Sequence, residues 1–256
     1  MAGVPFSSLK QDAVSGIKRI AELGLDAMEL EFVQGVKMKE EGAARVKDAA
    51  KSFGVVLTAH APYFINLNSP EEQKLKNSRK HILDTAKILH LCGGVSFTFH
   101  PGFYLKSPAD QVYQVVKKEL TSLYQEIANL YPDLLVSPET TGKPSSFGSL
   151  EELLSLCSDI KGLNICIDFA HLHARTNGGF NTYEEFSGVF ESIKKINPNI
   201  LNQLHMHVSG ISYGVKGEIK HLPFQESDFN YRDFLKALIC FKVKGILVCE
   251  SPILEE

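Results

Sequence analysis

A chain of 256 residues with 44% hydrophobic and 22% charged residues is long enough for one large α/β domain or two small ones, and its composition excludes an intrinsically disordered protein. A formal net charge of −3 argues modestly against a protein that holds nucleic acid by charge alone, although bound divalent cations would change the local balance. Five cysteines without a C-x-x-C pair are typical of reduced, buried thiols. With no signal peptide and no apolar run of membrane-spanning length, we expect a cytoplasmic protein without a membrane partner.

Helices and strands are predicted to alternate from the N-terminus onward. After a vestigial strand at the start, Ser7 and Ser8 are expected to cap a helix that runs to Gly24. Further helices are predicted over residues 37–53, 70–91, 107–130, 150–157, 183–196 and 230–240. Strands are predicted over residues 27–32, 57–60, 95–100, 134–139, 165–168, 204–207 and 246–250. Residues 209–229 are expected to form a long polar loop.

This alternation predicts parallel βαβ units in an α/β fold. Seven clear strands, one vestigial strand and no linker favour a single (β/α)8 TIM-barrel domain over residues 1–256. Its first strand would be curtailed, and its last helix missing or short. A doubly wound open sheet is the alternative, because periodicity cannot show whether a sheet closes.

Six consecutive predicted strands end on a side chain that can bind a metal ion. These residues are spaced roughly 30 to 40 apart, the length of a strand, a helix and two loops. They are His60, His100, Glu139, Asp168, His207 and Glu250. In a barrel they would converge at one face, as a nitrogen and oxygen ligand set suited to zinc or manganese. Converging carboxylates would also repel one another unless a cation lay between them.

Each of these residues also has an ordinary structural interpretation. A single histidine can be a hydrogen-bonded core residue, the glutamates can be solvated loop carboxylates, and Asp168 can cap a helix. The repetition at barrel spacing favours the metal site. Outside the series, His171 can bind a further metal, His221 can be a ligand or a loop residue, and His173 and His205 are expected to be structural.

Three residues that lie just past predicted strand ends are candidates for contact with a ligand. Tyr63 and Phe64 come directly after the His60 turn, and Lys37 follows the strand at residues 27–32. The two aromatic side chains can stack on a ligand, or they can close the core, as loop aromatics often do.

Several segments together resemble the endonuclease IV family of apurinic/apyrimidinic endonucleases, among the xylose-isomerase-like barrels. They are His60-Ala-Pro-Tyr-Phe-Ile-Asn-Leu67, His100-Pro-Gly102, Glu139-Thr-Thr-Gly142, Cys166-Ile-Asp168-Phe-Ala-His171, Met206-His207 and Glu250-Ser-Pro252. The resemblance runs from about Ser7 to Pro252, in a short form like that of archaea. It implies a zinc-dependent hydrolase of DNA repair that acts on damaged double-stranded DNA, and we expect a monomer.

The resemblance also implies a ligand set for two or three zinc ions per chain, with manganese as the alternative. One ion would be held by His60, His100 and Glu139. Glu139 would bridge to a second ion, held also by a further set of residues: Asp168, His207 and Glu250. His171 and His221 would hold the third.

Further implied roles concern catalysis and DNA contact. A metal-bound hydroxide would attack the phosphorus on the 5′ side of an abasic site. Glu139 and Glu250 would position and deprotonate that water. Tyr63, Phe64 and Lys37 would match the family's DNA-penetrating loops, which help to expel the abasic sugar from the stack.

The chain departs from the family pattern in three places, one of which is the curtailed first strand and final helix. The family's aspartate two residues before His221 is replaced by Ile219, with Glu218 one position further away. The third metal is therefore expected to be weak or absent. After the histidine, Gln225-Glu226-Ser227 replaces the family's Gly-Glu-Gly.

Two other functions remain open. A single-metal sugar isomerase or epimerase of the same barrel class would use one divalent ion and two carboxylates for proton transfer. The histidine pair His60 and His100 counts against that alternative, while the altered third-metal motif counts for it. A metal-bound module that recognises damaged DNA or a phosphorylated ligand without cleaving it is the third possibility.

Overall fold

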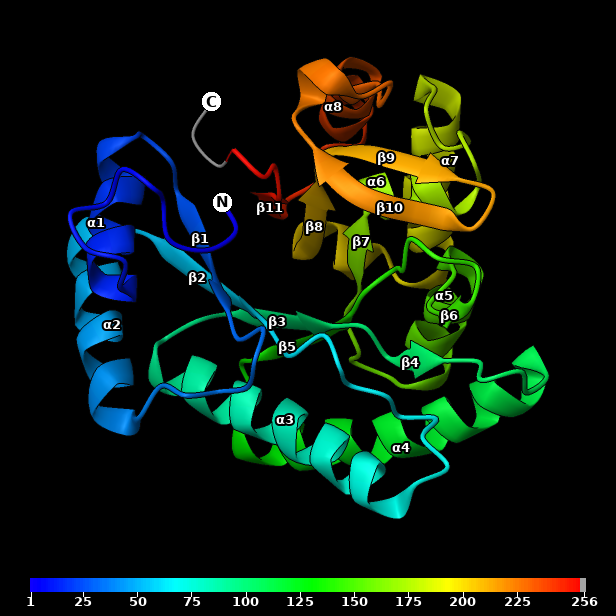
Figure 1. The fold of residues 1–256 in the computed structure, drawn as a ribbon, viewed down its shortest axis with the longest axis horizontal. Helices are drawn as coiled ribbons and strands as arrows, with labels where there is room; N and C mark the ends of the chain where they lie inside the picture. Colours follow the sequence, from blue (N-terminus) through cyan, green and yellow to red (C-terminus); the bar gives the residue numbers. More distant parts are fainter. Residues whose placement is uncertain (254–256) are drawn as a thin grey trace. The chain divides into compact units, whose positions relative to one another are not determined.

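The structure, a computed structural model, describes residues 1–253 in two compact units (Figure 1). The N-terminal unit comprises Met1–Gly102 and Gln114–Ser137. The C-terminal unit comprises Phe103–Tyr113 and Pro138–Ile253. The single-domain organisation over residues 1–256 stays a prediction.

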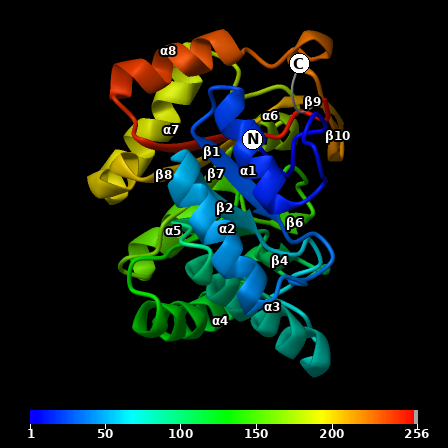
Figure 2. The same cartoon turned by 90° about the vertical axis from the view of Figure 1, so that its left-hand side faces the viewer.

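The N-terminal unit is built on a four-stranded sheet. Its strand order is β1 (Ala27–Glu31), β2 (Val56–His60), β3 (Ser96–Phe99) and β5 (Leu135–Pro138). The helices that follow or precede these strands are α1 (Ala13–Glu22), α2 (Glu40–Phe53), α3 (Glu72–Leu91) and α4 (Ala109–Leu130). The β1–β2 and β2–β3 pairs are parallel, as predicted. Helices α1 and α2 pack against each other and face the viewer in Figure 2.

The start of the chain confirms the vestigial first strand. Ala2 forms a single parallel bridge with Glu29, whose backbone N–H donates to the carbonyl of Met1 at 2.9 Å. The first helix begins later than predicted, at Ala13, because Asp12 and not Ser7 or Ser8 caps it. The Asp12 carboxylate accepts a hydrogen bond from the backbone N–H of Ser15, which satisfies an otherwise unbonded helix donor.

The C-terminal unit holds a second parallel sheet, in the order β11 (Gly245–Cys249), β8 (Leu204–Val208) and β7 (Cys166–Asp168). Its helices are α5 (Leu150–Asp159), α6 (Phe169–Arg175), α7 (Tyr183–Ile196), α8 (Tyr231–Phe241) and the short 3₁₀ turns η1 (Pro198–Asn202) and η2 (Phe224–Glu226). Short strands are β4 (Gly102–Phe103) and β6 (Ser146–Phe147). All five residues of β8 are buried, as expected for a strand covered on both faces.

Local sequence fixes the helices of this unit. Ser149 is the N-cap of α5 and Thr182 is the N-cap of α7, and each forms a capping box with the glutamate three residues later. Short α6, which the sequence patterns did not predict, begins directly after Asp168, whose carboxylate caps it. Phe169 of α6 packs against rings of α7 and α8, with centroids 4.5 to 5.9 Å apart, so the helix is anchored in an aromatic core.

Residues 209–229 were predicted to be a polar loop, and that prediction was wrong for most of the segment. They form a β-hairpin of β9 (Gly210–Gly214) and β10 (Gly217–Leu222). Ile211 of β9 packs on Ala170 and Ala174 of α6, so the hairpin is anchored to that helix. The alternation of apolar and polar residues is a weak signal along two strands this short, which explains why they were not predicted.

No helix follows β11 within the described residues, whose last stretch, 251–253, includes a turn. The part of the prediction of a missing or short last helix that concerns residues 254–256 lies outside the described residues. Among residues 1–253, no helix is long and apolar enough to cross a membrane.

Candidate metal centre

The N-terminal unit brings together two of the predicted histidine ligands, His60 and His100. His60 ends β2 and is buried, and its Nδ1 lies 2.6 Å from the carbonyl oxygen of Ala61. His100 follows β3, the neighbouring strand, and the two ring centroids are 5.4 Å apart. Adjacent parallel strands therefore deliver both imidazoles to the same edge of this sheet.

The three predicted DNA-contacting residues also lie in this unit, on its exterior. The side chains of Tyr63 and Phe64 are 45% and 56% exposed, although they are large and apolar. Tyr63 packs against His60 with ring centroids 4.6 Å apart, and Phe64 packs against His81 of α3. Lys37 is exposed before α2 and donates to Gln34. Both aromatic rings thus keep a face or edge accessible from solution.

In the C-terminal unit, Glu139 and Asp168 are held side by side by their backbones. Glu139 bridges to Cys166 of β7, and the N–H of the next residue, Thr140, donates to the Cys166 carbonyl. The hydroxyl of Thr140 accepts from the N–H of Asp168 at 2.9 Å and also lies 3.2 Å from the Asp168 carbonyl. Both carboxylates are essentially inaccessible to solvent.

His207 lies on β8 in register with Asp168, and its Nδ1 faces two glutamates. It is 3.4 Å from Glu139 Oε1 and 3.2 Å from Glu250 Oε1. Glu250, at the end of β11, is placed by its N–H, which donates to the carbonyl of Val208. Ligand atoms of Glu139, Asp168 and His207 all lie within 4.8 Å of one another.

A second histidine cluster adjoins this carboxylate pair in the same unit. His171 Nδ1 lies 3.3 Å from Glu139 Oε1 and 3.4 Å from Asp168 Oδ2. Its Nε2 lies 3.4 Å from Nε2 of His221, which comes from β10. His221 Nδ1 in turn lies 3.7 Å from Glu250 Oε2. The predicted residues of the C-terminal unit therefore form one continuous cluster.

Sequence reasoning missed one member of this cluster. Glu218 of β10 places its carboxylate 3.6 Å from His171 Nε2 and 3.9 Å from His221 Nε2. Ile219, which occupies the family's aspartate position, is 66% exposed. The signal in the sequence was the glutamate one position away, but using it required knowledge of the hairpin register.

Electrostatics in the cluster favour a bound cation. Burial by itself would lower the pKa of His171, yet the carboxylates of Asp168, Glu139 and Glu218 raise that pKa well above its ordinary value. Burial lowers the pKa of His221, and the positive charge of His171 lowers it further. The carboxylates around His171 thus favour positive charge at this position.

The donor set fits divalent metal ions. Four carboxylates and three imidazoles meet in this unit, and carboxylates this close to one another repel unless a cation lies between them. Imidazole nitrogen and carboxylate oxygen are ligands that suit zinc and manganese. Metal-binding histidines commonly hold their other ring nitrogen on a backbone carbonyl, as His171 does with Thr140 at 2.9 Å.

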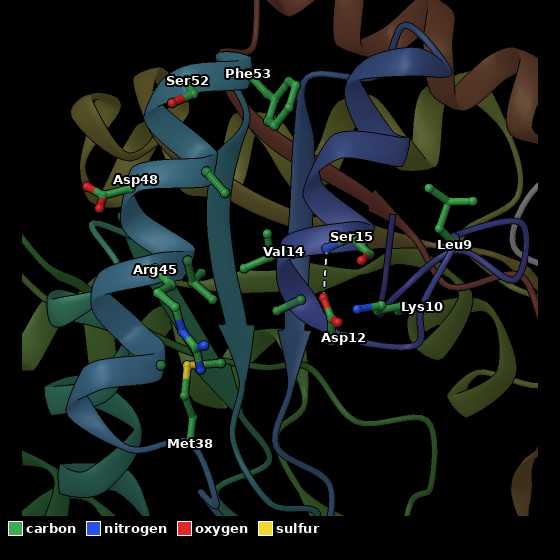
Figure 3. Close-up of a pocket in the computed structure, with 14 residues that line it drawn as sticks. Leu9, Lys10, Asp12, Val14, Ser15, Met38, Arg45, Asp48, Ser52 and Phe53 are labelled. Atoms are coloured by element: carbon green, nitrogen blue, oxygen red, sulfur yellow. Dashed lines mark hydrogen bonds between the residues drawn. The ribbon is translucent and has the colours of Figure 1, made fainter.

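A hollow between α1 and α2 in the N-terminal unit has different chemistry. It measures about 750 Å³ and is shown in Figure 3. Its polar groups belong largely to the helices themselves, such as Asp12, whose carboxylate caps α1 through Ser15. No buried histidine or carboxylate cluster lines it, so it is not the site of the predicted chemistry.

A family described as xylose isomerase-like TIM barrel matches residues 17–256. An uncharacterized protein of Methanocaldococcus jannaschii is 42% identical over 255 residues, which cover 99% of this chain and 91% of that protein. A probable endonuclease 4 of Methanosphaera stadtmanae is 28% identical over 145 residues, or 55% of this chain. This chain spans half the length of that second relative.

Two solved structures share the fold. Endonuclease IV from Thermus thermophilus superimposes with a TM-score of 0.74 at 17% identity, over 99% of this chain and 94% of that one. A D-tagatose 3-epimerase-like protein superimposes with a TM-score of 0.76 at 22% identity, over 98% of this chain and 90% of that one. The family match and these likenesses confirm the predicted (β/α)8 fold class.

Proposed function

The chain belongs to the xylose isomerase-like TIM barrel family, and from that premise we propose that it is a metal-dependent phosphodiesterase that cleaves DNA on the 5′ side of abasic sites. The observation that carries the proposal is the position of Glu139, whose Oε1 lies 3.3 Å from His171 Nδ1 and 3.4 Å from His207 Nδ1. Glu139 lies beside both imidazoles and would be available as a ligand of a divalent metal ion, as would its neighbour Asp168. The relatives named as endonuclease 4 support the same reaction class.

Zinc is the ion that these residues suit best, with manganese as the alternative. In the C-terminal unit it would be held by the carboxylate and imidazole cluster: Glu139, Asp168, His171, His207, His221 and Glu250. In the N-terminal unit, His60 and His100 would offer a further pair of nitrogens. Divalent ions held there would stabilise negative charge on a phosphate and make a water molecule acidic enough to react near neutral pH.

The protein's own carboxylates would handle the proton. Glu139 is buried and Glu250 is nearly so, with 1% and 10% side-chain exposure. In such a water-poor site, each carboxylate can orient a water molecule and accept its proton at the time of attack. Their two histidine contacts fix the orientation of both carboxylates, since His207 Nδ1 lies within 3.4 Å of each.

Tyr63, Phe64 and Lys37 would contact the damaged duplex. Exposed aromatic rings can stack on bases next to a lesion and help to hold an abasic sugar outside the helix. The exposed Lys37 ammonium can pair with a backbone phosphate. Replacing Tyr63 with Ala should weaken binding of abasic DNA more than it lowers metal content, and equal losses of both would assign the tyrosine a structural role.

The direct test is incision of a duplex oligonucleotide that carries one tetrahydrofuran abasic analogue. We expect cleavage on its 5′ side, and we expect Glu139→Gln to lower the rate by about 10³-fold or more while circular dichroism stays unchanged. Glu226→Gln, at an exposed position in η2, is the matched control and should cleave as the native protein does. Native-like cleavage by Glu139→Gln would contradict the assigned role of Glu139. Tight binding of the duplex without any cleavage would instead identify a recognition module.

A single-metal sugar isomerase or epimerase is the second candidate. It is favoured by one subset of the cluster, in which two glutamates and an aspartate surround His207. Such a site would hold one ion and leave two carboxylates for proton transfer at carbon. It would leave the facing nitrogens of His171 and His221 without a role. Epimerisation of a ketohexose by the metal-loaded protein, with no incision of abasic DNA, would establish this alternative.

A further inference from the structure

We propose that Glu218 is a protein ligand of the metal ion held by His171 and His221, so that this ion has three protein ligands in spite of Ile219. This inference rests on the proposed metal centre and deepens it. It concerns a residue that the sequence pattern placed outside the site.

The separations among the three side chains match those of ligands that share one ion. His171 Nε2 and His221 Nε2 are 3.4 Å apart, and the two oxygens of Glu218 lie 3.6 Å from the first and 3.9 Å from the second. Ligands about 2.1 Å from a tetrahedral zinc ion lie about 3.4 Å from one another. The three groups therefore surround a common point without requiring a large rearrangement.

A β-bulge explains how Glu218 and His221 come to lie on the same face of β10. In a regular strand, residues three positions apart point to opposite faces, whereas residues two apart share a face. The register shifts here: Glu218 pairs with Tyr213 and Lys220 pairs with Ser212, so Ile219 is the additional residue. The bulge shortens the effective spacing between the glutamate and the histidine from three to two.

The orientation of both imidazoles supports this assignment. His171 Nδ1 lies 2.9 Å from the carbonyl oxygen of Thr140, and His221 Nδ1 lies 3.3 Å from the carbonyl oxygen of Glu250. A carbonyl oxygen only accepts, so each Nδ1 carries the proton that it donates. Nε2 is therefore the ring nitrogen that each imidazole would offer to a cation, and the two Nε2 atoms lie 3.4 Å apart.

The backbone beneath Glu218 is shaped to admit its carboxylate. The N–H of Glu218 donates to the carbonyl of Gly142 at 2.9 Å. A Cβ atom on Gly142 would lie 2.7 Å from Glu218 Oε2 and 3.0 Å from His171 Cδ2. Glycine at position 142 therefore allows the glutamate and the histidine to approach each other, and any larger residue would separate them.

The test counts metal ions in the intact protein and in three variants. Protein is loaded with zinc, dialysed and measured by elemental analysis, and affinity is measured by competition with a chromophoric chelator. We expect Glu218→Gln to lose one equivalent of zinc, or to bind it at least about 10-fold more weakly. Glu226→Gln and Ile219→Ser serve as controls, and both should keep the native stoichiometry and affinity.

Gly142→Ala provides an independent variant that leaves Glu218 in place. We expect it to weaken the same equivalent of zinc, because its methyl group would displace the carboxylate. Native zinc stoichiometry and affinity in Glu218→Gln would overturn the inference and leave the proposed function standing. Failure of the native protein to bind any zinc or manganese would overturn both, so the two failures are distinguishable.

Discussion

His171 and His173 lie two residues apart on the same short helix, are both buried, and have different surroundings. Both ring nitrogens of His173 have ordinary structural partners: Nδ1 lies 2.8 Å from the carbonyl oxygen of Gly179, and Nε2 lies 3.1 Å from Asp228 Oδ1. His171 uses only Nδ1 for a backbone carbonyl, and its Nε2 faces His221 and Glu218. Burial and residue type are therefore poor guides to metal binding.

The surrounding groups make the difference between the two histidines. Asp228 also accepts from the hydroxyl of Tyr213 at 2.7 Å, so the His173 side chain belongs to a closed hydrogen-bonded chain with one carboxylate. His171 contacts three carboxylates and a second imidazole in a space from which water is largely excluded. The three carboxylates around His171 favour a bound cation there, whereas His173 contacts a single carboxylate.

The largest expected effect separates the two histidines by metal content. His171→Ala should lose one equivalent of metal, or bind it about 100-fold more weakly, and lower the rate of incision by about 10³-fold. His173→Ala should keep the native metal content. Elemental analysis of both variants after dialysis checks this, and loss of metal from His173→Ala with retention in His171→Ala would reverse the assignment.

The stability of the metal-free protein should fall in both variants. His173→Ala removes a buried ring and both of its hydrogen bonds, and we expect it to lower the free energy of unfolding by about 2–4 kcal/mol. The measurement is urea denaturation of metal-free protein. His171→Ala should destabilise the metal-free protein by at least as much, because it leaves a cavity and removes the imidazole that offsets the negative charge of three neighbouring carboxylates.

Removal of the metal should distinguish the two histidine variants by a smaller effect, seen in the melting temperature. A site filled at 100 times its dissociation constant adds about 2.7 kcal/mol to stability, which for a chain of this size corresponds to roughly 5–10 °C in Tm. Treatment with a chelator should therefore lower the Tm of the native protein and of His173→Ala by that amount. The decrease should be smaller in His171→Ala, and an equal decrease in all three proteins would contradict the difference between the two histidines.

The smallest effect concerns Asp228. Burial by itself would raise its pKa, but hydrogen bonds from Tyr213 and His173 lower the pKa below the ordinary value for aspartate. The stabilisation it provides is complete above the unfolded-state pKa of about 3.9 and is lost as the pH falls through the lower folded-state value. Because the Asp228 side chain is 58% exposed and its interactions are screened by solvent, Asp228→Asn should cost less than about 1 kcal/mol at pH 7 and progressively less below pH 4. A pH-independent difference would assign Asp228 an uncharged role.

The sequence was sufficient to locate most strand ends, because parallel strands that are buried on both faces are continuous apolar runs that stop abruptly. Each predicted strand end from His60 to Glu250 lies at or next to the end of an observed strand. Helix starts were less well predicted: α1 begins at Ala13, since capping depends on which side chain can reach a backbone N–H, and several polar residues precede it.

Two features of the site could not be predicted from the pattern. Helix α6 has only seven residues, too few for periodicity to identify it, although the capping role of Asp168 was one of its expected interpretations. The position of Glu218 depends on a bulge at Ile219, and a bulge is set by how two strands pair and not by either strand alone. Whether the residues of the site bind metal stays a prediction.

The most direct measurement is anomalous diffraction at the zinc edge from crystals of the zinc-loaded protein. The account predicts strong anomalous peaks at bonding distance from Nε2 of His171 and His221 and beside the carboxylate of Glu139, with none beside His173. Crystals that contain zinc by fluorescence but show no peak at this cluster would contradict the metal centre, and with it the proposed phosphodiesterase.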